Sequence, residues 1–430
     1  MARTRPQPFQ VFRVGGSVRD ELLGRPDADR DFVVVGATPE LMIASGYRPV
    51  GRDFPVFLHP ETHEEYALAR TERKHGRGYR GFEFFASPEV TLAEDLIRRD
   101  LTINAMARGD DGILVDPFGG AADLAAGLLR HVSPAFAEDP LRVLRVARFA
   151  ARFGFSIAPA TEALMRSIVA SGELATISPE RIWQELSKGL TEIHPSRLLA
   201  TLRECGALAH LMPEVDALYG VAQPPEHHPE VDAGVHVAMA LDWSAAHEFS
   251  LAARYAILAQ NLGKAATSST AWPRHVGQER ASVRLAQQLS NRLRVPQECA
   301  DAARLAARWH RVVHRAAELR PATCLDFFNA TDALRRPERL DVVLDASMAD
   351  ACSRPGAAQD YPPATVLRDA LAVVKSVDAG AIARQVVGGT GKSVSGRGRD
   401  PGDAIAKALR SARLAALRAW RRSRGVNQSR

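Results

Sequence analysis

The residues with the clearest chemical potential lie between positions 14 and 36. Gly15 and Gly16 follow a short apolar run and precede a helix-like segment that spans residues 17–24. Two glycines before a helix let a phosphate approach backbone N–H groups at the positive end of the helix dipole. This pattern therefore predicts a site for a phosphate group.

Two carboxylates follow the helix-like segment. Asp29 and Asp31 stand two residues apart at the start of a strongly β-prone run over 32–35. Because side chains alternate along a strand, both carboxylates are expected on the same side. Such a pair, together with substrate phosphates, suits Mg²⁺. A phosphate cradle beside a metal-binding pair indicates phosphoryl or nucleotidyl transfer with two metals.

The glycine pair and the carboxylate pair are each weak evidence alone, but their occurrence in this order is specific. The segment reads GG-x-x-R-D, then D-x-D before a hydrophobic strand, and R-R-D-x-x-x-N-A and E-D-x-x-R follow at 98–105 and 138–142. In these motifs the chain resembles the polymerase-β-like nucleotidyltransferases. Within them it resembles the bacterial tRNA nucleotidyltransferases (CCA-adding enzymes), of the multifunctional type, and their poly(A) polymerase relatives. The resemblance spans about residues 11–380 and is densest before residue 153.

The resemblance implies a role for each motif. Asp29 and Asp31 are the expected catalytic residues and Mg²⁺ ligands. Asp139 and Arg142 are expected to act as a protein template that reads the incoming base. The full set of positions expected to bind CTP or ATP comprises Gly16, Arg19, Arg99, Asp100, Asn104, Asp139, Arg142, Arg145 and Arg148.

Arginines recur along the helix that we predict over residues 138–153. Arg142, Arg145, Arg148 and Arg152 are spaced by three, three and four residues, which places four guanidinium groups on one helix face. No acidic residue intervenes between these arginines. An anionic ligand, such as a nucleoside triphosphate, therefore explains the stripe better than a solvated face does.

The wider pattern predicts how these residues are positioned. Short β-prone runs at 47–50, 54–59 and 64–70 lead into a glycine-containing segment, 72–88, that we interpret as a mobile loop. Thr91 and Glu94 form a capping box before the next helix. From residue 138 onward the pattern is almost entirely helical. The predicted fold class is an α+β nucleotidyltransferase head, with a small mixed β-sheet and helices, followed by an all-α neck, body and HD-like helical region.

The predicted division of the chain has four parts. Residues 1–137 form the catalytic head, and 138–222 form a helical neck and body with the nucleotide template and RNA-binding helices. Residues 233–345 form an HD-like helical domain. Residues 346–430 form a C-terminal helical tail with a flexible linker at 388–403.

The HD-like region departs from the relatives it resembles. HD phosphohydrolase domains hold metal through a separate histidine, an adjacent His-Asp pair and a later aspartate. His236 stands at the first position, but Gln260 and Asn261 occupy the pair, and Arg311 follows His310 in place of a carboxylate. Amide side chains are weak ligands beside imidazole and carboxylate. We expect the fold to persist and the phosphohydrolase activity to be lost.

The composition of the chain limits the kinds of partner and the compartment that we expect for it. The net charge of +6 suits a polyanion. The four cysteines are far apart, which argues against a zinc site or a disulfide framework. We find no signal peptide and no run of about 20 apolar residues, and therefore expect a cytoplasmic protein without membrane contact. The expected partners are tRNA, CTP and ATP, and the chain is expected to be a monomer or homodimer.

The predicted function is template-independent addition and repair of the 3′-terminal CCA of tRNA. Poly(A) polymerase is the nearest alternative, and the attached HD-like domain favours CCA addition over it. A partial enzyme that adds only CC or only A is a third reading, and the unabridged segment 73–87 favours full activity. A non-catalytic RNA-binding relic is opposed by the intact Asp29 and Asp31 pair.

Overall fold

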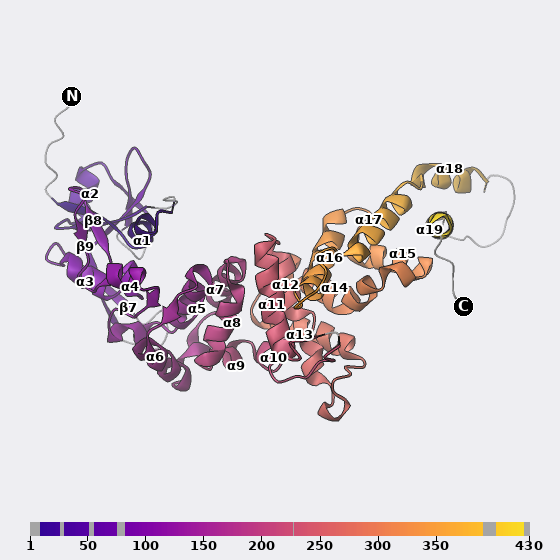
Figure 1. Ribbon diagram of the computed structural model, residues 1–430. Helices are drawn as coiled ribbons and strands as arrows, with labels where there is room; N and C mark the ends of the chain where they lie inside the picture. Colours follow the sequence, from indigo (N-terminus) through magenta and orange to yellow (C-terminus); the bar gives the residue numbers. More distant parts are fainter. Residues whose placement is uncertain are drawn as a thin grey trace. The chain divides into compact units, whose positions relative to one another are not determined.

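The computed structural model describes residues 9–25, 30–50, 56–74, 82–226, 228–389 and 401–424. The chain divides into two compact units, Met1–Leu211 and Met212–Arg430 (Figure 1). The first combines a mixed sheet with helices, and the second is helical, so the predicted fold class is confirmed. The finer division into four parts stays a prediction.

Within the described residues, the first unit contains a seven-stranded sheet in which only β2 and β5 pair in parallel. The strands are short, and apolar residues such as Val14 and Val33 lie buried between the sheet and its helices. In spatial order they are β3 (Arg48–Val50), β4 (Val56–Leu58), β5 (Glu65–Leu68), β2 (Asp31–Val35), β1 (Gln10–Val14), β8 (Ala107–Gly109) and β9 (Leu114–Val115).

Short helices begin directly after the strands that carry the motifs. The predicted glycine turn leads from β1 into α1 (Gly16–Leu22), and α2 (Pro39–Ala44) follows β2. The capping box of Thr91 and Glu94 is confirmed at the start of α3 (Leu92–Ile97). The short helix α4 (Gly120–Ala125) follows β9.

The segment predicted as a mobile loop, 72–88, is largely an antiparallel ribbon. β6 (Arg70–Lys74) pairs with β7 (Phe82–Ala86) over five residue pairs, and residues 75–81 lie outside the described part. Our prediction gave more weight to the glycines of this segment than to the alternating β-prone residues at its two ends. The loop interpretation is therefore wrong for both flanks.

Helices complete the first unit. After a 3₁₀ turn at Pro134–Glu138 come α5 (Leu141–Phe153), α6 (Pro159–Ala170), α7 (Pro179–Thr191), α8 (Pro195–Glu204) and α9 (Ala207–Leu211). The helix predicted over 138–153 begins three residues later, because Asp139 is extended and Pro140 is the N-cap. The apolar face of α5 packs against α7 and α8.

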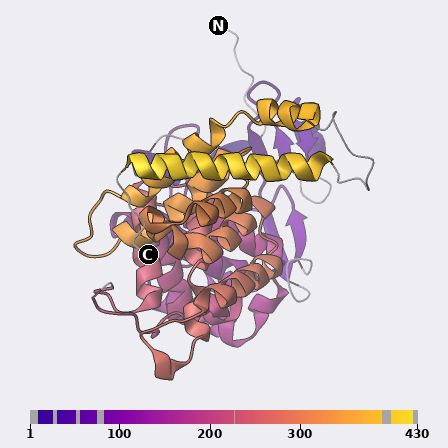
Figure 2. The ribbon, with the colours of Figure 1, turned by 90° about the vertical axis from the view of Figure 1, so that its right-hand side faces the viewer.

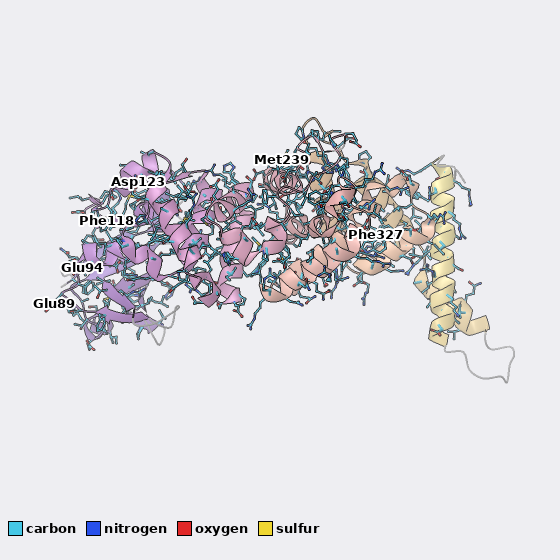
Figure 3. The ribbon with its side chains drawn as sticks, turned by 90° about the horizontal axis from the view of Figure 1, so that it is seen from below. Glu89, Glu94, Phe118, Asp123, Met239 and Phe327 are labelled. Carbon is cyan, nitrogen blue, oxygen red and sulfur yellow. The ribbon has the colours of Figure 1, made fainter. Side chains whose placement is uncertain are left out.

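The second unit consists of helices in its described residues. Figure 3 labels Phe327, which is fully buried among them. Figure 2 shows α19 as one long helix lying across α15 and α17. Helices of the unit are α10 (Pro213–Asp216), α11 (Ala233–Ala246), α12 (Leu251–Ala259), α13 (Gln278–Arg292), α14 (Gln297–His314), α15 (Pro321–Thr331), α16 (Pro337–Cys352), α17 (Pro362–Lys375), α18 (Ala379–Gly389) and α19 (Pro401–Ser423).

Two further features of the described residues bear on the predictions. All four cysteines are buried as free thiols. Among the described helices, none combines the length and apolar character that a bilayer span requires. Most of the predicted linker at 388–403 lies outside the described residues, and its two ends belong to α18 and α19.

Candidate active site

A cavity of about 630 Å³ opens in the first unit between the sheet and α5. Every predicted site residue that the structure describes lines it: Gly16, Arg19, Asp31, Arg99, Asp100, Asn104, Asp139, Arg142, Arg145 and Arg148. Asp29 lies outside the described residues. Segments separated by more than a hundred positions in the sequence therefore converge on one basic pocket.

The glycine turn at the head of α1 has a geometry that only glycine fits. Gly15 has φ +70°, a left-handed conformation that penalises a side chain. A Cβ there would come within 2.6 Å of Nη1 of Arg99. The Gly15 N–H donates to the carbonyl of Met106, 3.1 Å away. The turn thus brings the start of α1 and the Arg99 guanidinium into contact at the pocket wall.

Arg19 lies one turn into α1 and is almost completely buried. Its Nη1 donates to Oδ1 of Asn104, and its Nε donates to Asp20, 2.9 Å away. The guanidinium also stacks on the ring of Phe153 at 5.0 Å. Burial lowers the pKa of Arg19, although the Asp20 carboxylate opposes that shift. The side chain is therefore held rigidly beneath the glycine turn.

Asp100 is the hub that ties these segments to α5. Its Oδ1 accepts hydrogen bonds from Nδ2 of Asn104 (2.9 Å) and from the N–H of Leu101 (2.8 Å). Its Oδ2 accepts a hydrogen bond from Nε of Arg145 at 2.7 Å and forms an ion pair with Nη2 at 2.7 Å. Burial alone would raise the pKa of Asp100, but the Arg145 charge and these hydrogen bonds hold it well below its usual range.

The arginine stripe of α5 has protein partners, which corrects the expectation of an unrelieved stripe. Arg145 binds Asp100, Arg148 donates to Glu185 at 2.6 Å, and Arg152 donates to Asp20 at 2.9 Å. These carboxylates come from other elements, so their positions could not be read from the helix itself. The partners fix the guanidinium groups in place.

Arg142 faces the pocket beside Asp139 and is held by backbone carbonyls. Its Nη1 donates to the carbonyl of Ala135 (2.9 Å), and its Nη2 donates to that of Arg98 (2.6 Å). Oδ1 of Asp139 accepts the N–H of Leu141 at 3.1 Å, and Oδ2 accepts Nη2 of Arg181 at 2.8 Å. Both groups are therefore fixed before any ligand binds.

Asp31 lies at the first position of β2, exposed at the pocket edge. In the parallel pairing of β2 with β5 its register partner is Glu65, which lines the same pocket. Neighbouring residues in register project from the same face of a sheet. Two carboxylates from adjacent strands thus border the cavity that the arginines also line, and carboxylate oxygens are ligands that suit Mg²⁺.

Sequence reasoning missed two functional candidates, Glu65 and Arg181. Glu65 could not be paired with Asp31 because parallel register depends on tertiary contacts. Arg181 had a usable signal: Ser178 followed by Pro179 has the N-cap and N1 residues that are typical of a helix start, and Ser178 does cap α7. That start places Arg181 in the first turn, but only the fold shows that it reaches Asp139.

Replacing Asp100 tests how much this network contributes to the stability of the first unit. We expect Asp100→Ala to lower the free energy of unfolding of the first unit by about 3–5 kcal/mol, because Arg145 is left partly buried without its main partner. The depressed pKa also means that the Asp100 contribution is present above the unfolded pKa of about 3.9. It is lost as pH falls below that value. Urea denaturation of both proteins across acidic pH measures this, and a difference that stays constant down to the lowest pH would contradict it.

Two family sequence models match the chain between residues 11 and 219. The model described as "Poly A polymerase head domain" matches residues 11–130. The model described as "Probable RNA and SrmB- binding site of polymerase A" matches residues 154–219. The helix α5, which carries the arginine stripe, lies between these two regions.

The chain is similar over most of its length to curated bacterial proteins. It is 61% identical over 379 residues to the "Multifunctional CCA protein" of Nitrosomonas europaea, covering 88% of this chain and 92% of that protein. Among solved structures, it is 26% identical to the Bacillus stearothermophilus CCA-adding enzyme in complex with CTP, with a TM-score of 0.62 and coverage of 97% and 94%. The Thermotoga maritima CCA-adding enzyme, solved in complex with tRNA, shares the fold at 20% identity and a TM-score of 0.58, with coverage of 95% and 87%.

Proposed function

The chain belongs to the family of multifunctional CCA proteins, and on this premise we propose how its pocket performs their reaction. It is a tRNA nucleotidyltransferase that adds CCA to tRNA 3′ ends and takes CTP and ATP as substrates. The resemblance inferred from the sequence motifs is thereby confirmed. The assignment of this reaction to particular residues is our proposal, and it is supported by the contacts within the pocket.

The observation that carries the mechanism is that the carboxylates of Asp31 and Glu65 line the same cavity as the fixed arginines. Membership of the family implies dependence on a divalent metal, and we propose Mg²⁺. Asp31 and Glu65 offer the hard oxygen ligands that this ion prefers, with Asp29 as the further expected ligand. When bound, the metal lowers the pKa of the tRNA 3′-hydroxyl and offsets the charge on the leaving pyrophosphate.

The protein itself binds and orients the nucleotide. The start of α1 at Gly16 offers backbone N–H groups to the triphosphate, and Arg99, Arg145 and Arg148 offer guanidinium groups beside it. Because their carboxylate partners already hold these arginines, little reorganisation is required when the phosphates bind. Asp100 and Asn104 act mainly as positioning residues, through Arg145 and Arg19.

Base choice is assigned to Asp139 and Arg142. Cytosine and adenine both present an amino donor and a ring-nitrogen acceptor, which an aspartate and an arginine can satisfy. Uracil and guanine present a different pattern and leave a buried polar group unpaired. No nucleic-acid template is then required. The basic chain holds tRNA mainly by its phosphate backbone. The tRNA substrate makes the cytoplasm the expected compartment, and the oligomeric state stays a prediction.

A direct assay separates this function from its alternatives. The purified protein is incubated with Mg²⁺, a tRNA that lacks CCA, and each labelled nucleotide singly and in combination. Two additions with CTP, and a third that requires ATP, are expected. A long tract from ATP alone would indicate the poly(A) polymerase alternative, and a stop after CC or a need for a CC end would indicate a partial enzyme. A product of unchanged length with every nucleotide would contradict the proposal.

We further propose that the HD phosphohydrolase activity is lost. At the pair position, Gln260 donates to the Ala346 carbonyl at 3.3 Å, and Asn261 donates to Oδ1 of Asp350 at 2.9 Å. Both amides thus present N–H groups to protein oxygens, and neither supplies charge to offset dehydration of an ion.

The expected result is no hydrolysis of 2′,3′-cyclic nucleotides or simple phosphoesters above background with Ni²⁺, Mn²⁺, Co²⁺ or Mg²⁺. The protein is assayed with and without each metal, beside the variant that combines Gln260→His and Asn261→Asp. Robust metal-dependent hydrolysis by the unmutated protein, removed by His236→Ala, would show that the activity persists.

A further inference from the structure

A cluster of buried polar side chains in the second unit lies outside the candidate active site. It lies where the segment between residues 223 and 232, here called the connector, folds back on itself before α11. The Gln223 N–H donates to the Val231 carbonyl at 2.6 Å, and the Asp232 side chain caps α11 through the N–H groups of Gly234 and Val235. These bonds fix the connector against the first turn of α11.

This arrangement brings His228 and Glu230 of the connector against His236 of α11. Nδ1 of His228 lies 2.8 Å from Oε1 of Glu230, and Nδ1 of His236 lies 2.9 Å from the same oxygen. One potential ligand atom from each residue lies within 4.8 Å of the others. Ligand atoms that share a tetrahedral Zn²⁺ ion at its usual bond lengths of about 2.0–2.2 Å lie about 3–3.5 Å apart. The three side chains therefore already have nearly the spacing that one ion requires.

Two buried atoms of this group make no hydrogen bond. They are Oε2 of Glu230 and Nδ1 of His236, although the latter lies close to Oε1 of Glu230. His236 is 1% exposed, so water from the surface does not reach its ring. The short separation, without a hydrogen bond, places a ring nitrogen and a carboxylate side by side in a buried position. Unsatisfied buried polar atoms of this kind call for an additional partner.

The second ring nitrogen of His236 has the kind of hydrogen-bond partner that metal-bound histidines have. Its Nε2 lies 3.3 Å from Oδ1 of Asp350, a carboxylate that also accepts hydrogen bonds from Asn261 (2.9 Å) and Arg354 (3.1 Å). A ligating histidine commonly donates its second N–H to a carboxylate, which fixes the tautomer. With the proton on Nε2, the lone pair of Nδ1 faces Glu230 and His228.

We propose that His228, Glu230 and His236 bind one first-row divalent transition metal such as Zn²⁺, as a structural ion that joins the connector to α11. Two imidazoles and one carboxylate suit Zn²⁺ better than Mg²⁺. The set differs from the H…HD…D pattern, because only His236 is shared and the Gln260–Asn261 pair is not used. The site is therefore independent of phosphohydrolase chemistry.

Two cations near the cluster oppose a divalent ion. Lys264 donates from Nζ to Oε1 of Gln223, whose own amide lies 3.5 Å from Glu230. Arg354 is paired with Asp350. Arg354 is thus compensated locally, whereas Lys264 contacts a neutral amide. Removing the Lys264 charge should tighten metal binding, an effect that a purely structural hydrogen-bond cluster would not show.

The test uses the full chain, freed of metal by a chelator and kept in excess Mg²⁺ so that the oxygen-rich head site is filled. Zn²⁺ bound after equilibrium dialysis is counted by mass spectrometry, and the visible absorption of added Co²⁺ reports its ligands. We expect one ion per chain. His228→Gln and Glu230→Gln should weaken binding by about 10- to 100-fold or more, Lys264→Met should strengthen it, and His247→Gln, an exposed histidine at the end of α11, should not change it.

Thermal unfolding with and without Zn²⁺ gives a second readout that is valid even for a destabilised variant. Zn²⁺ should raise the unfolding temperature of the unmutated chain, and that shift should be absent in Glu230→Gln. The proposal is overturned if the unmutated chain binds no Zn²⁺ under these conditions. It is equally overturned if Zn²⁺ stoichiometry and affinity are the same in His228→Gln, Glu230→Gln and His247→Gln.

Discussion

Asp31→Asn is expected to abolish incorporation of both CMP and AMP while tRNA binding survives. Asp31 lines the cavity at the start of β2 and has Glu65 as its register partner. An amide at this position keeps the size of the side chain but removes the charge that holds a divalent ion. Metal ions supply several kcal/mol of transition-state stabilisation. Since about 1.4 kcal/mol corresponds to tenfold, the rate should fall about 10³-fold or more.

The measurement is single-turnover addition of each nucleotide to a truncated tRNA, with tRNA affinity measured in parallel. Asp110→Asn is the matched control, because Asp110 is an exposed carboxylate of the same unit that does not line the cavity. Glu65→Gln should also slow both additions if it shares the ion. Near-normal rates for Asp31→Asn in Mg²⁺ would show that the metal ligands have been assigned wrongly. We expect Asp29→Asn to behave as Asp31→Asn does.

Local sequence signals predicted the elements that position the site. Glycines before a helix, a β-prone run after Asp31 and the capping box at Thr91 each act within a few residues. The structure has α1, β2 and α3 close to the predicted places. The described motif residues then meet in one pocket because these short elements leave the chain few alternative paths.

Contacts between elements that lie far apart in the sequence could not be predicted from the sequence. The helical period showed that four arginines share a face of α5. It could not show that Asp20, Asp100 and Glu185 approach that face from other elements. The parallel register of β2 with β5 likewise depends on the buried face of the sheet. The same limit hid the approach of His228 to His236, because nothing local distinguishes a metal ligand from an ordinary buried histidine.

Asp139→Ala is expected to relax base choice rather than slow every nucleotide equally. The wild-type carboxylate is held by the Leu141 N–H and by Arg181, so it cannot turn to suit a mismatched base edge. Incorporation of UMP or GMP should rise relative to CMP and AMP. Each unpaired buried polar group costs about 1–3 kcal/mol, so the change in selectivity should be roughly 5- to 150-fold. Competition between labelled nucleotides, read as ratios of incorporation rates, measures it.

A substitution of Arg181 tests the positioning of the template residue Asp139 separately from Asp139 itself. Arg181→Met removes the 2.8 Å bond to Asp139 but leaves the carboxylate in place. Selectivity should therefore fall in the same direction as in Asp139→Ala and by a smaller factor. The double variant should behave like Asp139→Ala alone, because the arginine acts through the aspartate. Arg166→Met, which removes an exposed guanidinium from α6 of the same unit, is the control.

Arg142→Ala completes the test, because it removes the donor half of the proposed template. Its guanidinium is anchored to two backbone carbonyls, so its direction is set by the segment before α5 and by the end of α3. Loss of this donor should raise use of UTP or GTP relative to CTP and ATP by a factor similar to that of Asp139→Ala. If both variants lower all four rates by one common factor and keep the wild-type ratios, these residues only support the helix, and the base is read elsewhere in the pocket.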